Sequence, residues 1–478
     1  MSEYIVINNP SYEYDVLAIL KSFYPEKNLK PMTPLNKLWV PGYEDGSVES
    51  FARLIVDEDE RSARLFIGGK EISINGSIKK AFYQAVSEYA GRTLPWGNLT
   101  GIRPTKIAYN LIESGESSEY IRNYYRTEHF VSDEKIALSI DIAKREKAII
   151  DELKGYSIYI GIPFCPSTCL YCSFTSYPII SYKKYVEDYL DCVIKELKWT
   201  AESFKGKALD SVYIGGGTPT TLEPAQLLRI INALKDNFDF SSIREFTVEA
   251  GRADSITEEK LKTLYDNGVT RISVNPQSFN QSTLDLIGRK ATAEDTIRAY
   301  ELARKTGFDN INMDVILGLP GETESDVQHT ADVLCKLSPD SLTVHSLAIK
   351  RASSMSKWIE EKGISSIKNT DDTMQIMYKA CREMDLKPYY LYRQKDSSGS
   401  FENVGYAREG KFGIYNILIM EEVQSIVAIG AGATSKRVSA NEKGETIIER
   451  CENVKDVKLY MEQLDEMIER KEKLFDTL

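Results

Sequence analysis

From residue 156 onward the sequence alternates short apolar runs with longer amphipathic segments, and this alternation limits the possible folds more than any other feature. Six strand-like runs lie at 157–162, 211–214, 245–249, 271–275, 312–317 and 341–347. Helix-like segments between them include 183–204, 224–237, 258–267, 295–306 and 325–337. Strands that alternate with helices pair in parallel, and repeated right-handed crossovers curl the sheet. The pattern therefore predicts an α/β fold with a partial, TIM-like (β/α)6 barrel.

Directly after the first of these strands, three cysteines, Cys165, Cys169 and Cys172, are spaced C-x3-C-x2-C. Three thiolates this close together can hold three irons of a [4Fe–4S] cube, which leaves the fourth iron open for another ligand. A structural zinc site would need a fourth nitrogen or sulfur ligand, and the three histidines of the chain are scattered. The remaining alternative, three buried free cysteines, explains the close spacing poorly.

The segment Tyr159–Phe164 before the cysteines, and Tyr171 before the third cysteine, give the chain a family resemblance. Residues 155 to 350 resemble the radical S-adenosylmethionine (SAM) superfamily, specifically the oxygen-independent coproporphyrinogen III oxidase group. Three later stretches, at 388–395, 402–406 and 430–433, are similar to the HemZ-type coproporphyrinogen dehydrogenase branch of that group. The resemblance implies a [4Fe–4S] cluster and SAM as cofactors, with the cluster held by the three cysteines.

Several polar or glycine residues follow or close successive strands, so we expect them to face the same mouth of the barrel. The resemblance implies that Gly216 and Glu249 bind the SAM molecule on the open iron, and that Tyr159 adds a contact. A glycine run after a strand lets backbone approach a ligand closely. Taken alone, the run 215–217 would be an ordinary tight turn, and Glu249 would be a solvated carboxylate.

The resemblance also implies a second SAM molecule. The positions that match its contacts are Tyr171, Gly217, Thr218, Gln277, Arg289, Asp314 and Ala348. A carboxylate such as that of Asp314 can accept hydrogen bonds from both ribose hydroxyls. The alternative is that 312–314 is a buried strand end whose aspartate caps the next segment. The sequence identifies no catalytic side chain.

Two positions depart from the pattern of the decarboxylating members of this group. Those members tend to carry a further cysteine after the third ligand and a histidine two residues after the conserved tyrosine, where this chain has Phe174 and Gly161. The Cys-x-Phe form is shared with heme-chaperone and heme-degrading relatives. The leading hypothesis is oxygen-independent decarboxylation of coproporphyrinogen III to protoporphyrinogen IX. The alternatives are radical degradation or methylation of heme, and a heme carrier that retains the cluster and the SAM site.

The periodicity divides the chain into three predicted parts. Residues 1–153 read as a small α/β domain with a helical connector, 154–350 as the barrel, and 351–478 as an α+β domain that covers the substrate. In the first part, strands are predicted at 4–8, 52–56 and 63–67 and helices at 12–23 and 78–89. Thr105 is predicted to cap a further helix, and the last helix is predicted at 457–474.

Composition limits the partners. The chain has 60 Lys and Arg against 71 Asp and Glu, a net charge of -11, which argues against nucleic-acid binding. It has no apolar run of transmembrane length and no signal-peptide pattern at its start, which favours a cytoplasmic protein. The expected partners are a tetrapyrrole substrate and a one-electron donor such as flavodoxin or ferredoxin. Arg393 and Lys395 could bind the carboxylates of the tetrapyrrole; the alternative is that these two residues belong to a solvated loop. The oligomeric state is left open.

Overall fold

The computed structural model describes residues 3–25, 27–36, 39, 49–173, 176–350, 353–363, 367–394 and 401–476. The chain forms two compact units, residues 1–144 with 392–402 and residues 145–391 with 403–478. The first boundary lies inside helix α5 (Asp133–Ile150), and most of the segment 351–478 belongs to the second unit. The division into three domains remains a prediction.

The first unit is a small α/β domain. Its sheet has the order β2-β1-β3-β4-β5, with bounds Leu29–Met32, Glu3–Ile7, Ala52–Val56, Ser62–Ile67 and Lys70–Asn75. Helices α1 (Glu13–Phe23) and α2 (Ile78–Ala90) bury apolar side chains in one core with these strands. Strands β2 and β5 were not predicted. Helix α3 (Thr105–Glu113) begins at Thr105 itself and α4 spans Ser118–His129, so the prediction that Thr105 caps α3 from outside is wrong: Pro104 occupies the cap position.

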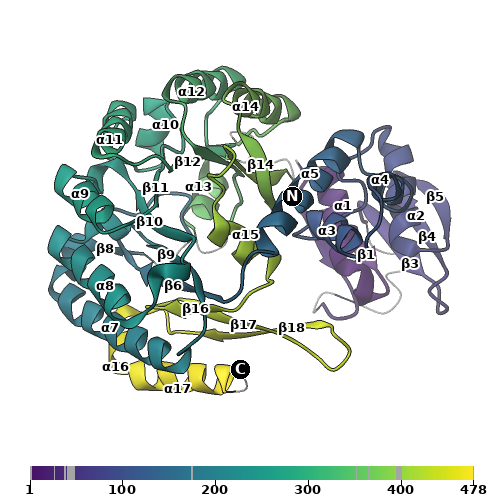
Figure 1. Ribbon diagram of the computed structural model, residues 1–478. Coiled ribbons are helices and arrows are strands. Elements are labelled where there is room, and N and C mark those ends of the chain that lie inside the picture. The colour runs from purple at the N-terminus through teal and green to yellow at the C-terminus, as the bar shows by residue number, and fades with distance from the viewer. Residues whose placement is uncertain are drawn as a thin grey trace. The chain divides into compact units, whose positions relative to one another are not determined.

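The second unit contains the predicted barrel. Six strands pair in parallel in chain order, namely β6 (Tyr156–Ile162), β9 (Leu209–Gly216), β10 (Glu245–Gly251), β11 (Arg271–Val274), β12 (Ile311–Leu317) and β13 (Ser341–Ser346). Helices cover the outer face of these strands, as Figure 1 shows, and include α7 (Val186–Ser203), α8 (Pro224–Asn237), α9 (Glu258–Asp266), α11 (Ala293–Thr306) and α12 (Glu324–Leu337). A short helix, α10 (Gln281–Leu286), precedes α11. Parallel strands covered on both faces are mostly apolar, as in β6, where six of the seven residues are buried and Ser157 is the one buried polar side chain. The predicted six-repeat barrel is confirmed.

The C-terminal part of the chain extends this sheet at both edges. Strand β16 (Ile426–Ile429) pairs in parallel with β6, and β17 (Thr434–Ala440) and β18 (Thr446–Glu452) follow in antiparallel. At the other edge β15 (Glu402–Ala407) pairs antiparallel with β13, and β14 (Lys387–Arg393) lies next to it. The helices of this part are α13 (Met355–Lys362), α14 (Asp371–Glu383), α15 (Ile414–Glu421), α16 (Val457–Glu462) and α17 (Leu464–Phe475).

The last helical segment is broken. A single helix was predicted at 457–474, but Gln463, whose φ of -111° lies outside the helical range, ends α16 and precedes α17. Helix α17 lies along the outside of the unit near β17 and β18 (Figure 1). The break therefore gives α16 and α17 separate directions.

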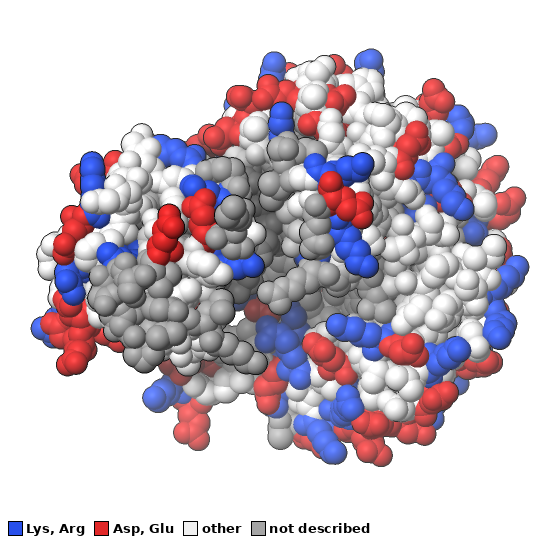
Figure 2. All heavy atoms as spheres, turned by 180° about the vertical axis from the view of Figure 1, so that it is seen from behind, with Lys and Arg blue, Asp and Glu red and all other residues white. Residues whose placement is uncertain are grey.

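The surface mixes charges of both signs. On the face shown in Figure 2, basic and acidic side chains are interspersed. Within the described ranges, no helix is both long enough and apolar enough to cross a membrane.

Candidate functional site

The three motif cysteines lie on a loop that is anchored to the barrel. Short strand β7 (Phe164–Cys165) pairs with β8 (Tyr177–Pro178), which closes the loop at its base. The backbone N–H of Leu170 donates to the carbonyl of Ile287 at 3.0 Å, and Leu170 packs against an apolar cluster around Ile287. None of the three cysteines is in a disulfide, and Cys165 and Cys169 are each 8% exposed. The loop therefore presents three reduced thiols from a fixed backbone.

Neighbouring groups raise or lower the pKa of the Cys165 thiol. Burial raises the pKa of Cys165, and the neighbouring thiols of Cys172 and Cys169 raise it further, while the hydroxyl of Thr218 donates to its Sγ at 3.5 Å and lowers it. Arg252 donates from Nη1 to Sγ of Cys169 at 3.7 Å and to the carbonyl of Ser167 at 2.8 Å. A buried guanidinium beside the loop favours the thiolate forms that iron requires.

Arg252 is a residue that the sequence reasoning missed. Its side chain is 5% exposed and is held by Asp254, which accepts from Nε at 3.0 Å and from Nη2 at 2.7 Å. A signal was present, because Arg252 directly follows β10 at the same edge of the sheet as the predicted site residues. Arg252 is not among the SAM contacts that the resemblance implies, because it contacts the cysteine loop instead.

The residues around the loop fit a three-ligand [4Fe–4S] cluster. A Cβ atom at Gly217 would lie 2.7 Å from the carbonyl oxygen of Phe164 and 3.0 Å from Sγ of Cys165, so only glycine leaves the thiol its space. In the part of the chain that the structure describes, no three His, Cys, Asp or Glu side chains converge on one metal ion. A cube instead spreads its thiolate ligands over separate irons.

Tyr159, Gly216 and Glu249 come together beside the loop. Gly216 has a φ of +105°, and a Cβ there would lie 3.3 Å from the Tyr159 hydroxyl. Burial raises the pKa of Glu249 to about 7, while hydrogen bonds from the Tyr213 hydroxyl and the Gly216 N–H lower it and the charge of Asp314 raises it. Glu249 is thus a partly buried, hydrogen-bonded carboxyl and not the solvated residue that the alternative interpretation described.

Tyr171 and Arg289 form a second contact group. Arg289 donates from Nη2 to the Tyr171 hydroxyl at 3.1 Å and from Nη1 to the carbonyl of Asn275, just after β11, at 2.7 Å. Burial opposes the charge of Arg289, but the neighbouring Tyr171 and Cys169 raise its pKa. The guanidinium therefore connects the cysteine loop with the end of the fourth barrel strand.

Gln277 and Asp314 form a third group. The backbone N–H of Gln277 donates to the carbonyl of Asp314 at 2.9 Å. Gln277 has a left-handed φ of +67°, which is unusual for a residue other than glycine. Asp314 lies inside β12 and accepts from Nδ2 of Asn312 at 2.8 Å, so it does not cap a helix. Burial works to raise the pKa of Asp314, but hydrogen bonds from His345, Asn312 and Thr343 hold it below its usual value.

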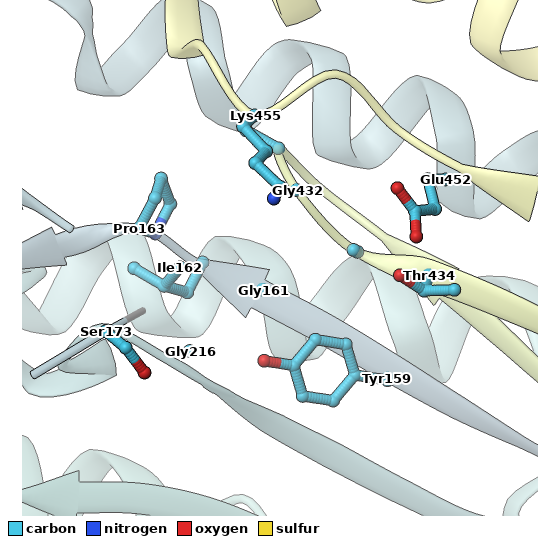
Figure 3. A pocket seen from close by; sticks show the side chains of 12 residues that line it. Tyr159, Gly161, Ile162, Pro163, Ser173, Gly216, Gly432, Thr434, Glu452 and Lys455 are labelled. Carbon is cyan, nitrogen blue, oxygen red and sulfur yellow. The ribbon is translucent and has the colours of Figure 1, made fainter. Parts of the chain in front are cut away.

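A cavity of about 270 Å³ opens beside Tyr159 and Gly216, as Figure 3 shows. Its walls come from β6, the cysteine loop and the C-terminal strands, and its lining residues include Tyr159, Gly161, Ser173, Gly216, Gly432, Thr434, Glu452 and Lys455. In Figure 3 the hydroxyl of Tyr159 is directed toward the side where Gly216 and Ser173 lie. The cavity therefore adjoins both the loop and the Tyr159 group.

The turn that follows β16 closes one side of this cavity. A Cβ at Gly430, which has a φ of +99°, would lie 2.5 Å from the carbonyl oxygen of Gly161 and from the Tyr189 hydroxyl. The Tyr189 hydroxyl donates to that carbonyl at 2.6 Å and accepts from the Ala431 N–H at 3.0 Å. The small-residue run 430–433 both packs on β6 and lines the cavity.

The other predicted positions are less closely involved. Ala348 is half-buried two residues beyond β13, and among the described residues it makes no hydrogen bond to Asp314 or Gln277. Phe174 and Lys395 lie outside the described residues. Arg393 donates from Nη1 to the carbonyl of Leu99, and burial lowers its pKa.

Comparison with known proteins gives consistent results. The family model "Radical SAM superfamily" matches residues 159–334. The oxygen-independent coproporphyrinogen-III oxidase-like protein HemZ of Bacillus subtilis is 40% identical over 414 residues, which cover 84% of this chain and 82% of that protein. The heme chaperone HemW of the same organism is 37% identical over 198 residues, covering 41% of this chain and 51% of that protein. The solved coproporphyrinogen III oxidase HemN of Escherichia coli has a TM-score of 0.52 at 23% identity, covering 68% of this chain and 72% of that one, which shows a shared fold.

The chain therefore belongs to the radical SAM superfamily, in the group of oxygen-independent coproporphyrinogen III oxidase-like proteins. The cofactors of this family are a [4Fe–4S] cluster and SAM. In this chain Cys165, Cys169 and Cys172 are the residues that fit the cluster.

Proposed function

We propose that this protein is a radical SAM enzyme that converts coproporphyrinogen III to protoporphyrinogen IX without oxygen. The observation that carries the proposal is the loop of three cysteines without disulfides, which lies at the strand ends of the barrel against Gly217 and Thr218 and beside a cavity. The choice of substrate is supported by the name of the 40% identical relative that spans most of the chain.

The bound cofactors supply a 5′-deoxyadenosyl radical, made by one-electron cleavage of the C–S bond of SAM. The protein residues bind and orient. Arg252 favours the thiolate forms of the loop, and the Gly216 and Gly217 backbone leaves room for ligands. Glu249 and Asp314 supply carboxylates for the polar groups of SAM, and Tyr171 with Arg289 fixes the distance between the loop and β11. A second SAM molecule at Tyr171, Gly217, Thr218, Gln277, Arg289, Asp314 and Ala348 is part of the proposal.

In the proposed reaction, each of two propionate side chains loses one hydrogen atom, one electron and CO2. The chemistry that the cofactors would supply is removal of a hydrogen atom from the carbon next to the pyrrole ring, with that hydrogen ending on 5′-deoxyadenosine. The substrate radical then gives one electron to an external acceptor, its C–C bond to the carboxylate breaks, CO2 leaves and a vinyl group remains. Exclusion of water and oxygen by the buried site protects the radical.

A heme carrier is the second candidate. Two observations favour it: the 37% identity with a heme chaperone over 198 residues, and Gly161 in place of a histidine. A Cβ at position 161 would lie 3.4 Å from the Tyr159 ring and 3.5 Å from the carbonyl oxygen of Ile429, so strand β16 covers this position closely. A carrier would bind heme without changing it.

The experiment that separates these functions is anaerobic incubation of the reconstituted protein with SAM, dithionite and an electron acceptor. Coproporphyrinogen III and heme are supplied in separate reactions, and the products are identified by mass spectrometry. We expect coproporphyrinogen III to lose two CO2 with formation of 5′-deoxyadenosine, and heme to remain intact. SAM cleavage without a decarboxylated product would reject this function, and tight binding of unchanged heme would favour the carrier.

We also propose a cytoplasmic location. None of the seven cysteines forms a disulfide in the structure, which suits a reducing compartment. Fractionation of cells that express the chain, followed by detection with an antibody, would test this location.

A further inference from the structure

The cluster needs an electron from outside the chain for each cleavage of SAM. Only the loop cysteines form a cluster motif, because Cys192, Cys335, Cys381 and Cys451 lie singly in the sequence. A reducing partner must therefore approach the loop, since electrons tunnel efficiently only over short distances. The surface next to β7 and β8 is consequently the part of the protein to search for a docking site.

That surface carries an exposed apolar residue directly beside the cluster loop. Cys165 pairs with Pro178 across β7 and β8, and Ile180 follows two residues later in helix α6 (Ile179–Tyr182). Ile180 is 86% exposed, one of the most exposed large apolar side chains among the described residues. The ring of Tyr182 lies 6.4 Å from the ring of Phe164, the residue before Cys165. The exposed segment is thus joined to the loop by direct packing.

Three lysines lie on or against the segment that follows Ile180. Lys183 and Lys184 belong to that segment, and Lys458 comes from the start of α16. The Nζ atoms of Lys184 and Lys458 lie 4.9 Å and 5.1 Å from the centre of the Tyr185 ring. Hydrogen bonds from Lys458 and Lys184 lower the pKa of Tyr185. One aromatic ring therefore gathers two positive charges from segments that are far apart in the sequence.

Two acidic groups near this surface, Asp456 and Glu187, have hydrogen-bond partners other than the three lysine side chains. Asp456 caps α16 by accepting from the N–H groups of Lys458 and Leu459. Glu187, in the first turn of α7, is paired with Arg229, and Asp188 lies in the same turn, where a carboxylate complements the helix N-terminus. None of the three lysines forms an ion pair with a described carboxylate. The surface stays positive in a chain whose net charge is -11.

We propose that Ile180, Lys183, Lys184, Tyr185 and Lys458 form the docking surface for a small acidic one-electron carrier protein of the flavodoxin type. This proposal rests on the reductive use of the cluster in the proposed function, and not on the choice of tetrapyrrole. The overall negative charge repels an acidic carrier, so the local positive surface both attracts it and selects its orientation. Ile180 gives the interface an apolar centre, with the lysines at its rim.

The electron balance of docking is simple. One electron leaves the reduced flavin of the carrier and enters the cluster, and no bond forms or breaks between the two proteins. The carrier then leaves in its one-electron-oxidised form. A weak, salt-sensitive interface suits this repeated exchange, because small electron-transfer interfaces dissociate readily.

The test compares two double charge reversals in the reconstituted full chain. Lys183→Glu/Lys184→Glu changes the proposed surface, and Lys198→Glu/Lys205→Glu makes the same charge change toward the other end of α7 and just beyond it. Binding of a purified bacterial flavodoxin is measured by calorimetry at low and high salt, and SAM cleavage is measured with reduced flavodoxin and separately with dithionite. Ile180→Asp serves as a third variant, which probes the apolar centre.

We expect the surface variant to bind flavodoxin at least about ten-fold more weakly at low salt, with the difference shrinking at high salt. Its flavodoxin-driven SAM cleavage should fall in parallel, while dithionite-driven cleavage stays unchanged. Equal losses in the control variant, or unchanged flavodoxin affinity in both the surface variant and Ile180→Asp, would overturn the proposal. Binding of the surface to anionic lipid vesicles in place of flavodoxin would also overturn it. Loss of tetrapyrrole conversion with intact flavodoxin binding would instead count against the proposed function.

Discussion

The hydroxyl of Tyr213 donates a hydrogen bond of 2.5 Å to Oε1 of Glu249 inside the barrel. The ring of Tyr213 is itself fixed by stacking on Tyr415, with 4.5 Å between the ring centres. Burial raises the pKa of Glu249 to about 7, and the Tyr213 hydrogen bond works against this rise. Tyr213 therefore controls the protonation of a carboxyl that we expect to contact SAM.

The first prediction concerns the pH dependence of SAM binding. The ionised carboxylate attracts the cationic groups of SAM, so the affinity should increase as the pH rises through about 7. Tyr213→Phe removes a donor that favours the ionised form, so it should move the midpoint to higher pH and weaken binding at pH 7 about 3- to 5-fold. Equilibrium dialysis with labelled SAM between pH 6 and pH 9 measures this shift.

Glu249→Gln is the matched control for that measurement. Its amide does not titrate, so the pH dependence between pH 6 and pH 9 should flatten while the cluster remains intact. A midpoint that stays in place in Tyr213→Phe, or a dependence that persists in Glu249→Gln, would show that another group controls SAM binding.

The second prediction concerns the cluster ligands. Replacement of Cys165, Cys169 or Cys172 by alanine should abolish the visible absorbance of the reconstituted cluster and SAM cleavage, because a three-thiol loop has no spare ligand. Cys451→Ala, which changes a half-buried cysteine of β18, should keep both. Iron and sulfide content per chain provides the readout. Cluster loss in Cys451→Ala together with retention in Cys172→Ala would refute the assignment.

The barrel was predictable from sequence because its signals are local. Each buried parallel strand is a short apolar run, and helices such as α11 and α12 begin at capping residues that are visible in the sequence, Thr292 and Thr323. The cysteine spacing is local in the same way. Strand β2 (Leu29–Met32) escaped prediction because it is short and contains a proline, and β16 because its parallel partner β6 lies more than 260 residues earlier in the chain.

Part of the site depends on contacts that no local pattern records. Arg252 meets Cys169 across 83 positions of sequence, and the Tyr213 ring meets Tyr415 across the barrel. The role of the run 430–433 depends on the buried side chains of Tyr189 and Glu196, which approach it from α7. Such pairings follow from the packed fold, so residue type and spacing alone could not reveal them.

The third prediction concerns Asp314. Its carboxylate is held ionised by His345, Asn312 and Thr343, so it can accept two hydrogen bonds from ribose hydroxyls. Asp314→Asn keeps the shape and removes the charge, and it should weaken SAM binding or cleavage about ten-fold or more without loss of the cluster. Asn312→Ala removes the 2.8 Å hydrogen bond from Asn312 Nδ2 to Asp314 Oδ1, and it should weaken SAM binding or cleavage to a smaller extent. Unchanged SAM affinity and cleavage in Asp314→Asn would return the residue to a structural role.

The last prediction concerns a buried ion pair that fixes the cavity wall. Lys471 of α17 donates to Glu196 and to the carbonyl of Ala428, and both side chains are fully buried. Glu196 also accepts from the Gly430 N–H at 2.9 Å, so the pair ties α17 to the turn that lines the cavity. Lys471→Met leaves Glu196 charged and buried, and it should lower the free energy of unfolding of the second unit by about 3 kcal/mol.

Two features of the structure shape this expectation. The Tyr460 hydroxyl, at 2.6 Å, and Asn453 Nδ2, at 2.9 Å, still donate to Glu196, which keeps the cost near the lower end of the range for broken buried pairs. The double variant Glu196→Gln/Lys471→Met contains no buried charge, so it should be more stable than Lys471→Met alone. Urea unfolding followed by circular dichroism measures both. If the double variant were less stable than Lys471→Met, the buried charge would not be the source of the lost stability. If the double variant is the more stable one, weaker SAM binding in Lys471→Met would show that α17 supports the cavity through Gly430.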